Sequence, residues 1–288
     1  MSTYNQLLFA YRKQAEEVDI SFETLRAFLF ELCNEKQVDL FLQKDEEADP
    51  QIEKKYQEGV LRILQGEPMN YVLGYSYFYG YPFVVNEKVL IPRYETEELV
   101  GLILGKIDEY YPKQELVLGD IGTGSGAIAI ALKKEEPSLK VFASDISAEA
   151  LTVAEENAKK NDTDVCFLCG DMLEPLINKQ IVLDILVSNP PYIKADEQME
   201  HSVIDYEPRV ALFGGEDGLK FYRMIFEKAG QVVKKDGCMF FEIGYDQKER
   251  LSLLARSYFP DALIEVYKDI NNKDRMMMIR FHNPDTKN

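Results

Sequence analysis

The sequence of 288 residues predicts an α/β fold built on a doubly wound, mostly parallel sheet. From residue 116 onward, short apolar runs alternate with amphipathic helical segments. A glycine-rich turn at residues 122–126 follows the first run. A later run begins at Leu183 and stops at Pro190 and Pro191, which cannot donate to a β-ladder. Ligands bind at the carboxyl ends of strands in such sheets, and both features fall there.

The N-terminal residues 1–70 predict a small helical bundle, for which we expect partner recognition and no chemistry of its own. Ser21 can cap one helix, because apolar residues follow it at helical spacing. Asp49 and Pro50 supply the cap and the first position of another helix, which ends at residues 66–68, Gly-Glu-Pro.

Residues 71–90 predict a β-hairpin that connects the bundle to the α/β domain. Aromatic residues are interspersed with glycine and proline in this segment, a composition typical of a short hairpin. Interleaved aromatics can stack on nucleobases, but no Lys or Arg lies between Tyr71 and Asn86. We therefore interpret these aromatics as packing between two domains.

Residues 91–288 form the predicted α/β domain, in which a first helix follows residues 91–96. Strands are expected at residues 116–121, 140–144 and 164–168, from Leu183, and at residues 238–243, 262–267 and 276–281. Helices are expected from Ala127 and at residues 148–160, 219–233 and 247–258.

Composition limits the function classes. The chain has 33 Lys and Arg against 50 Asp and Glu, a net charge of −17, which argues against a protein that grips nucleic-acid phosphates over a large face. A local basic patch stays possible. No apolar run approaches the ~18 residues that span a bilayer. The N-terminus lacks a signal-peptide core and an Arg-rich transit pattern, so we expect a cytoplasmic protein.

The four cysteines include a Cys-x-x-Cys pair, Cys166 and Cys169. The expected strand at residues 164–168 includes Cys166 and ends just before Cys169, and residues three apart in a strand point to opposite faces. His201 and His282 stand alone in the sequence, at no metal-ligand spacing. We therefore expect buried structural thiols in a reducing cytoplasm, and no metal.

The glycine-rich turn indicates a nucleotide-like ligand. Glycines allow tight turning and close approach of the backbone to a ligand. Asp145 ends the next strand, where a carboxylate can accept hydrogen bonds from both ribose hydroxyls, and Met172 is placed to border an adenine. The turn alone fits a nicotinamide dinucleotide and S-adenosylmethionine equally well.

The tetrapeptide Asn189-Pro190-Pro191-Tyr192 suits the alkylation of a planar NH2 group. The side-chain oxygen of Asn189 and the carbonyl of Pro190 can accept both N–H protons, and Tyr192 can lie against the planar group. A proline-stopped strand followed by a plain loop is the alternative interpretation of the tetrapeptide in isolation. Together with Asp120 before the first glycine, the tetrapeptide favours S-adenosylmethionine over a hydride-transfer cofactor.

These motifs, with others along the chain, resemble the bacterial release-factor glutamine N5-methyltransferases, the HemK or PrmC family. The matching segments are residues 66–68, 71–74, 90–93, 95–97, 120–127, 145–147, 188–193, 206–208, 211–212, 214–215, 217–219 and 242–244, with Gln247, Asp269 and Arg275. Residues 66–280 are covered specifically and the helical bundle only in kind. Asn-Pro-Pro-Tyr is shared with adenine N6-methyltransferases, whereas the surrounding series is not.

The resemblance implies a class I S-adenosylmethionine-dependent methyltransferase fold, Rossmann-like, with S-adenosylhomocysteine as product. The implied activity is N5-methylation of the glutamine amide in the Gly-Gly-Gln motif of class 1 release factors. The implied cofactor-binding residues are Gly122, Thr123, Gly124, Ser125, Gly126, Asp145, Met172 and Asn189. The implied substrate-binding residues are Asn189, Pro190, Pro191 and Tyr192, of which Asn189, Pro190 and Tyr192 are the expected catalytic residues.

Two positions depart from the family pattern. Met172 stands where some members have tryptophan, so adenine contact there becomes thioether packing. Tyr94 replaces the usual proline after Arg93. The alternatives to the implied activity are an adenine N6-methyltransferase acting on DNA or RNA and, more remotely, a nicotinamide-dinucleotide-binding protein. Release factors are the expected partners, with no membrane and no direct nucleic-acid substrate.

Overall fold

The computed structural model describes residues 2–112, 115–194 and 205–281. The described residues divide into two compact units. The first comprises residues 2–75 with residues 205 and 206, and the second comprises residues 76–194 and 207–281.

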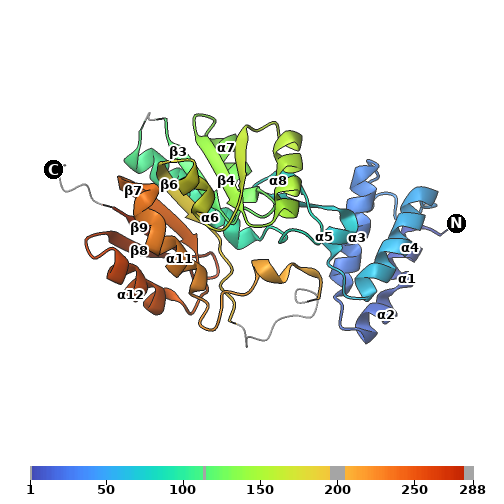
Figure 1. Cartoon of the computed structure of the whole chain (residues 1–288). Helices are drawn as coiled ribbons and strands as arrows, with labels where there is room; N and C mark the ends of the chain where they lie inside the picture. The colour runs from blue at the N-terminus through green and yellow to red at the C-terminus, as the bar shows by residue number, and fades with distance from the viewer. Residues whose placement is uncertain (1, 113–114, 195–204, 282–288) are drawn as a thin grey trace. The chain divides into compact units, whose positions relative to one another are not determined.

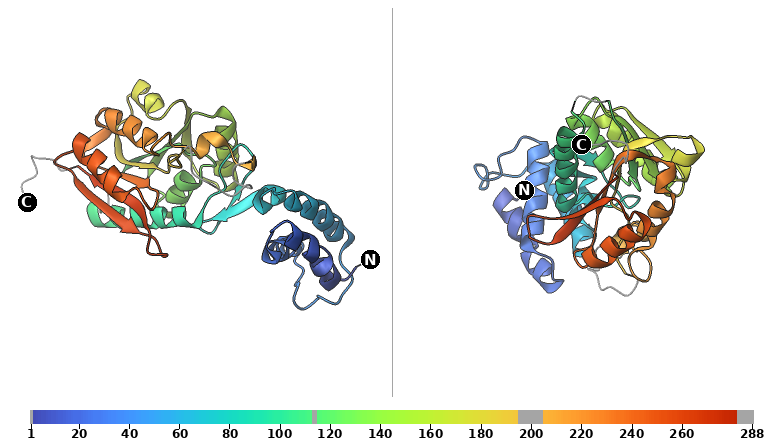
Figure 2. Two further views of the ribbon diagram at one scale, coloured as in Figure 1. Left: turned by 90° about the horizontal axis from the view of Figure 1, so that it is seen from below. Right: turned by 90° about the vertical axis from the view of Figure 1, so that its left-hand side faces the viewer.

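The first unit is a bundle of helices around its own apolar core (Figures 1 and 2). Its helices are α1 (Tyr4–Ala10), α2 (Arg12–Glu17), α3 (Phe22–Glu35), α4 (Pro50–Leu64) and α5 (Met69–Leu73). The predicted caps are confirmed: the Ser21 side chain accepts from the amide of Glu23, and Asp49 accepts from the amides of Gln51 and Ile52. Side-chain acceptors satisfy amides that lack a partner in the first helical turn.

The hairpin consists of β1 (Tyr75–Phe78) and β2 (Tyr81–Val84), and it is shorter than predicted. Residues 69–73 form α5 instead, which ends at Gly74 with a φ of 81°. Phe78 and Phe83 contact each other edge to face and join the core of the second unit. Phe78 and Phe83 thus contribute to a hydrophobic core, whereas Tyr77 is exposed.

The second unit contains a seven-stranded sheet with the strand order β5-β4-β3-β6-β7-β9-β8. The strands are β3 (Val117–Ile121), β4 (Lys140–Asp145), β5 (Val165–Cys169), β6 (Leu183–Ser188), β7 (Val233–Glu242), β8 (Leu263–Lys268) and β9 (Asp274–Arg280). All neighbours pair in parallel except β9, which is antiparallel to β7 and to β8. The predicted mostly parallel sheet is confirmed.

Helices pack on both faces of this sheet (Figure 1). One apolar core contains residues of α6 (Tyr94–Tyr110), α7 (Ala127–Glu135) and α8 (Ala148–Lys160). The other contains residues of α9 (Glu174–Asn178), α11 (Lys220–Lys228) and α12 (Lys248–Tyr258). Strand β9 shows the division, because Met276 and Met278 join the first core while Met277 and Ile279 join the second. Alternation along a strand thus supplies apolar side chains to both layers.

Two predictions about this unit were wrong in detail. The helix predicted to reach residue 233 ends at Lys228, and β7 begins at Val233, where it pairs with Leu183 of β6. Cys166 and Cys169 are exposed, not buried. Strand β5 lies at the edge of the sheet and is largely uncovered, whereas every residue of the central β6 is buried.

The site follows from the strand order. Successive strands run outward in one direction from β3 through β4 to β5, and in the other direction from β6 to β7. The order therefore reverses between β3 and β6. In doubly wound sheets, ligands bind at such a reversal, beyond the carboxyl ends of the strands.

Candidate active site

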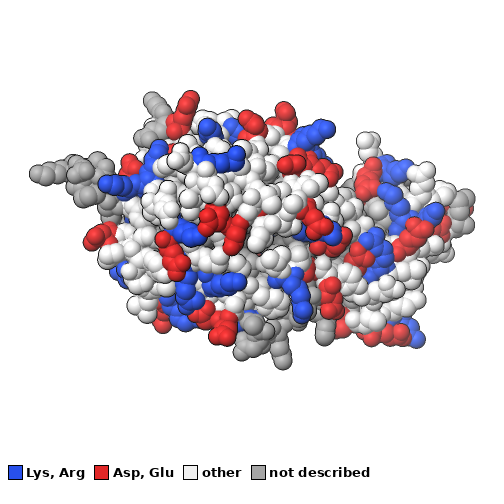
Figure 3. Space-filling view, viewed as in Figure 1, with Lys and Arg blue, Asp and Glu red and all other residues white. Residues whose placement is uncertain are grey.

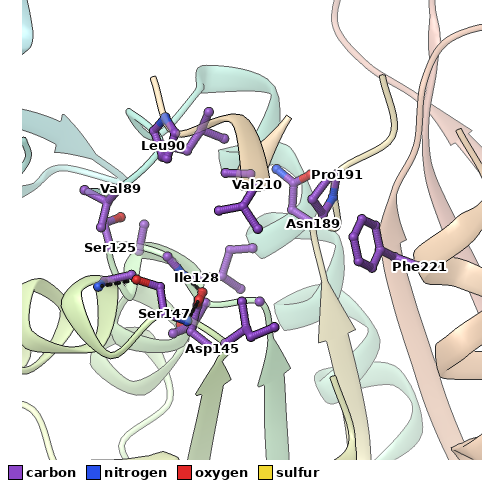
Figure 4. Close-up of a pocket in the computed structure, with 18 of the residues that line it drawn as sticks. Val89, Leu90, Ser125, Ile128, Asp145, Ser147, Asn189, Pro191, Val210 and Phe221 are labelled. Carbon is purple, nitrogen blue, oxygen red and sulfur yellow. Dashed lines mark hydrogen bonds between the residues drawn. The ribbon is translucent and has the colours of Figure 1, made fainter. Parts of the chain in front are cut away.

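A cavity of about 270 Å³ lies beyond the carboxyl ends of β3, β4 and β6, within the second unit (Figure 4). It is bounded by the segment at residues 88–96, the glycine turn, the end of β4, the loop after β6 and the start of α11. Asp145 and Ser147 lie on one side of it, and Asn189, Pro191 and Phe221 lie on the other (Figure 4).

The glycine turn is shaped by three residues in the left-handed region of backbone conformation. Gly122, Gly124 and Gly126 have φ values of 73°, 55° and 81°. A Cβ on Gly122 or Gly124 would meet no atom within 4 Å, so these positions face open space and a ligand can approach their backbone. A Cβ on Gly126 would lie 2.9 Å from Ile130 Cδ1 and 3.2 Å from Ala154 Cβ. Gly126 therefore serves packing between α7 and α8.

Asp145 ends β4 and holds two backbone segments together. Its Oδ2 accepts a hydrogen bond of 2.9 Å from the amide of Gly124, and its Oδ1 accepts one of 2.9 Å from the amide of Ser147 (Figure 4). Each carboxylate oxygen has a further lone pair. The side chain both fixes the glycine turn and lines the cavity.

Asp120, which precedes the turn, is fully buried. Its Oδ2 accepts a hydrogen bond of 2.6 Å from the hydroxyl of Thr123. Burial raises the pKa of the Asp120 carboxyl to about 7, although the hydrogen bond from Thr123 opposes the rise. The buried carboxyl thus holds the glycine turn in place through its hydrogen bond with Thr123.

Asn189 follows β6 directly, and its side chain is held by α6. Its Nδ2 donates a hydrogen bond of 3.2 Å to Oγ1 of Thr96, whose hydroxyl donates one of 2.6 Å to Oε2 of the buried Glu242. In the described part of the chain, no donor contacts Oδ1 of Asn189. The carboxamide therefore keeps a free acceptor where it lines the cavity.

Tyr192 occupies a different environment from Asn189. Its hydroxyl donates a hydrogen bond of 3.2 Å to Oε1 of Glu242, and Arg275 lies on its other side. Burial raises the pKa of the Tyr192 hydroxyl well above its usual value. Neither Tyr192 nor Pro190 lines the cavity, whereas Asn189 and Pro191 do.

The backbone after β6 is supported by a second loop. Ile193 forms a parallel β-bridge with Phe213. A Cβ on Gly214 would lie within 3 Å of the Pro191 carbonyl oxygen and of Tyr192 Cα, so only glycine allows this close approach. The loop therefore restricts the position of the Asn-Pro-Pro-Tyr segment.

The structure brings most of the predicted site residues to this one cavity. Those that line it are Gly122, Thr123, Gly124, Ser125, Asp145, Met172, Asn189 and Pro191. Met172 has a φ of 45°, and its carbonyl accepts a hydrogen bond of 3.2 Å from Ser144. The exposed Tyr94 begins α6 and does not line the cavity, whereas Pro92 and Arg93 do.

Several functional candidates were missed from the sequence. Thr96 and Glu242 belong to segments that support the family resemblance, but no role was inferred for either. Arg93, which lines the cavity, forms an ion pair of 2.5 Å with the buried Glu207. A signal for Glu242 existed, because a charged residue ending a strand of the parallel sheet lies at the ligand-binding edge.

Two further features concern metal ligands and membrane-spanning helices. Within the described ranges, no three His, Cys, Asp or Glu side chains gather to hold a metal ion, and no helix is long and apolar enough to cross a membrane. His201 and His282 lie outside the described residues. Lys and Arg are interspersed with Asp and Glu on the face shown in Figure 3.

Two family models match the chain. Residues 102–207 match the methyltransferase small domain, and residues 10–74 match the PrmC N-terminal domain. A solved methyltransferase from Pyrococcus furiosus, 17% identical, covers 78% of this chain and 98% of its own with a TM-score of 0.51. Fold and family model together define the class: this is a class I S-adenosylmethionine-dependent methyltransferase fold.

Curated relatives specify the family within that class. Release factor glutamine methyltransferase of Bacillus cereus is 44% identical over 83% of this chain and 85% of its own. That of Streptococcus pneumoniae is 37% identical over 96% of both chains. The chain belongs to the release factor glutamine methyltransferase family, as its motifs predicted.

Proposed function

We propose that this protein transfers a methyl group from S-adenosylmethionine to the side-chain nitrogen of the glutamine in the Gly-Gly-Gln motif of class 1 release factors. The observation that carries the proposal is the free acceptor of Asn189, held at a cavity whose other side is the glycine turn and Asp145. Family membership supports both the reaction and the substrate class.

The cofactor site we propose consists of Gly122–Ser125, Asp145 and Met172, with Asn189 beside it. Open space at Gly122 and Gly124 fits close contact between a ligand and the backbone. The free lone pairs of Asp145 suit two ribose hydroxyls, and Met172 gives apolar contact to an adenine. When bound, S-adenosylmethionine supplies an electrophilic methyl group on a sulfonium sulfur.

The substrate amide is the part that the chain's own residues must activate. An amide nitrogen is a poor nucleophile because its lone pair is delocalised. Asn189 Oδ1 accepts one of its N–H groups, and the carbonyl of Pro190, which is bonded to the cavity-lining Pro191, accepts the other. These hydrogen bonds orient the nitrogen, and they strengthen as positive charge develops on it. The N–C bond forms as the S–C bond breaks, and the nitrogen then releases a proton to solvent. Positioning supplies most of the acceleration.

We further propose that the N-terminal unit recognises the release factor. Its match to the PrmC N-terminal domain supports this role. Phe41 and Leu42 are 68% and 83% exposed and give this unit an apolar surface for contact. Replacing both with serine raises the KM for the release factor and leaves S-adenosylhomocysteine binding unchanged if the role is correct.

The test is transfer of labelled methyl from S-adenosylmethionine to three substrates. One is a purified class 1 release factor, the second is the same factor with alanine in place of the motif glutamine, and the third is DNA. We expect label on the first alone. Label on DNA, or on none of the three, contradicts the proposed function and leaves the fold unaffected.

A further inference from the structure

The orientation of the Asn189 carboxamide is decided by a chain of hydrogen bonds that ends inside the protein. A carboxamide presents an acceptor at one end and two donors at the other, and its two orientations have nearly the same shape. Only the orientation with Oδ1 free can accept a hydrogen bond from the N–H of a substrate amide. The neighbour that selects it is Thr96, whose Oγ1 lies 3.2 Å from Nδ2 of Asn189.

The Thr96 hydroxyl can donate only one hydrogen bond, and Glu242 accepts it. The Thr96 hydroxyl donates to Oε2 of Glu242 at 2.6 Å, in a site where the Glu242 residue is 3% exposed. An ionised carboxylate only accepts hydrogen bonds. Because its proton points to Glu242, Thr96 has only a lone pair left for Asn189. The nitrogen end of the carboxamide must then face Thr96.

Glu242 is itself held in place from the opposite side. Its Oε1 accepts from the Tyr192 hydroxyl at 3.2 Å, and Arg275 contacts the same hydroxyl while pairing with the buried Asp269. Two donors thus converge on one buried carboxylate, which lies at the end of β7. The arrangement joins α6, the loop after β6 and the strand β7 into one polar network.

We propose that Thr96 and Glu242 are positioning residues, which fix the Asn189 carboxamide with its oxygen toward the amide of the methyl acceptor. This inference rests on the proposed function and adds a role for two residues that touch neither reacting atom. It also assigns Tyr192 a supporting contact to Glu242, in addition to any contact with substrate.

Protonation of Glu242 would reverse the direction of the hydrogen bonds in this network. A protonated carboxyl can donate to Thr96, which could then donate to Oδ1 of Asn189 and turn the wrong end of the carboxamide to the substrate. The groups that face Glu242 are Tyr192, Tyr222 and Arg275, with Glu95 nearby. Burial raises the pKa of Glu242, while Thr96 and Arg275 oppose the rise. Turnover should therefore fall as acidity increases through this pKa.

The experiment compares Thr96→Val, Thr96→Ser and the matched control Thr152→Val in methyl transfer to the release factor. Valine keeps the shape of threonine without the hydroxyl, serine keeps the hydroxyl, and Thr152 is an exposed helical threonine on α8. We expect Thr96→Val to lower kcat on the order of 10- to 100-fold, as displaced catalytic geometry does. KM for the release factor and the Kd for S-adenosylhomocysteine should change by less than about twofold, because binding contacts remain. Thr96→Ser should restore most of kcat.

A pH profile of kcat for the wild type and Glu242→Gln completes the test, because glutamine does not titrate. We expect the acid limb of the wild-type profile to be absent in Glu242→Gln. Normal kcat in folded Thr96→Val, or a wild-type acid limb in Glu242→Gln, overturns the inference. If Thr96→Val does not fold, low kcat in folded Thr96→Ser also overturns it. An inactive wild type contradicts the proposed function itself, so the two failures are distinguishable.

Discussion

The hydroxyl of Thr123 donates a hydrogen bond of 2.6 Å to Oδ2 of Asp120, inside the protein beneath the glycine turn. One residue of this pair lines the cavity and the other does not. The carboxyl therefore influences the site through the backbone of the turn. Its burial also makes it a source of pH-dependent stability.

We predict that the wild type loses stability as the pH rises, because Asp120 ionises, and that Asp120→Asn abolishes this loss. Burial raises the pKa of Asp120 to about 7 in the folded protein, whereas an unfolded aspartate has a pKa of ~3.9. Between these values the unfolded chain loses the proton that the folded chain keeps. The stabilising effect is thus complete below pH ~4 and is lost as the pH rises through about 7.

Urea unfolding at a series of pH values checks this prediction. Asparagine is neutral throughout. As the pH rises from ~4.5 to ~7.5, the free energy of unfolding of Asp120→Asn should therefore increase relative to that of the wild type. Each unit of pKa shift corresponds to about 1.4 kcal/mol, so the gain amounts to a few kcal/mol at most. Parallel curves for the two proteins would show that Asp120 ionises normally.

We predict that alanine at two glycines of the turn has different main effects, on stability at Gly126 and on cofactor binding at Gly124. Gly126→Ala places a Cβ 2.9 Å from Ile130 and 3.2 Å from Ala154, in a left-handed conformation, so it should lower the free energy of unfolding by about 1–3 kcal/mol. Gly124→Ala has open space and only the backbone strain, so its cost should be about 1 kcal/mol. The S-adenosylhomocysteine Kd should rise more in Gly124→Ala. Equal binding by both variants would contradict a ligand beside Gly124.

We predict that Asn189→Ala lowers kcat on the order of 10²–10³, the usual loss for one preorganised group that stabilises developing charge. The protein should still fold and bind S-adenosylhomocysteine, because the glycine turn and Asp145 are untouched. Asn178→Ala, at the exposed end of α9, is the matched control. Near-normal turnover of folded Asn189→Ala would exclude the mechanism proposed for amide activation.

Local signals in the sequence predicted the elements whose ends depend on nearby residues. The caps Ser21 and Asp49 act within their own first turns, and both helices begin where the sequence indicated. Helix α8 occupies the predicted residues 148–160 for the same reason. The start of β7 was missed because Val233 pairs with Leu183, fifty residues earlier, and no periodicity reports such a pairing.

The site residues that lie at strand ends were predictable from the sequence. The site residues whose roles depend on contacts distant in sequence were missed. Asn189 directly follows β6 and Asp145 ends β4, so their meeting at one edge followed from the fold class. The bond between Thr96 and Glu242 joins residues 146 positions apart, on α6 and β7. The exposure of Cys166 depends on β5 being an edge strand, which requires the strand order.

We predict that Asp145→Asn weakens cofactor binding while the fold persists. Both carboxylate oxygens accept backbone amides, from Gly124 and from Ser147. Asparagine has only one oxygen, so its NH2 group must face one of these donors and leave an amide without an acceptor, which typically costs about 1–3 kcal/mol. The lost lone pairs also remove an acceptor proposed for the ribose hydroxyls. The Kd for S-adenosylhomocysteine should rise at least about tenfold, which corresponds to ~1.4 kcal/mol.

Calorimetric titration of wild type and variant with S-adenosylhomocysteine and with NAD gives the measurement. The wild type should bind the first and gain thermal stability from it, and should bind NAD not at all. A carboxylate after the second strand serves a ribose in either cofactor class, so the NAD arm separates the class from the contact. Unchanged affinity in Asp145→Asn would exclude the ribose contact, and tight binding of NAD by the wild type would exclude the proposed cofactor.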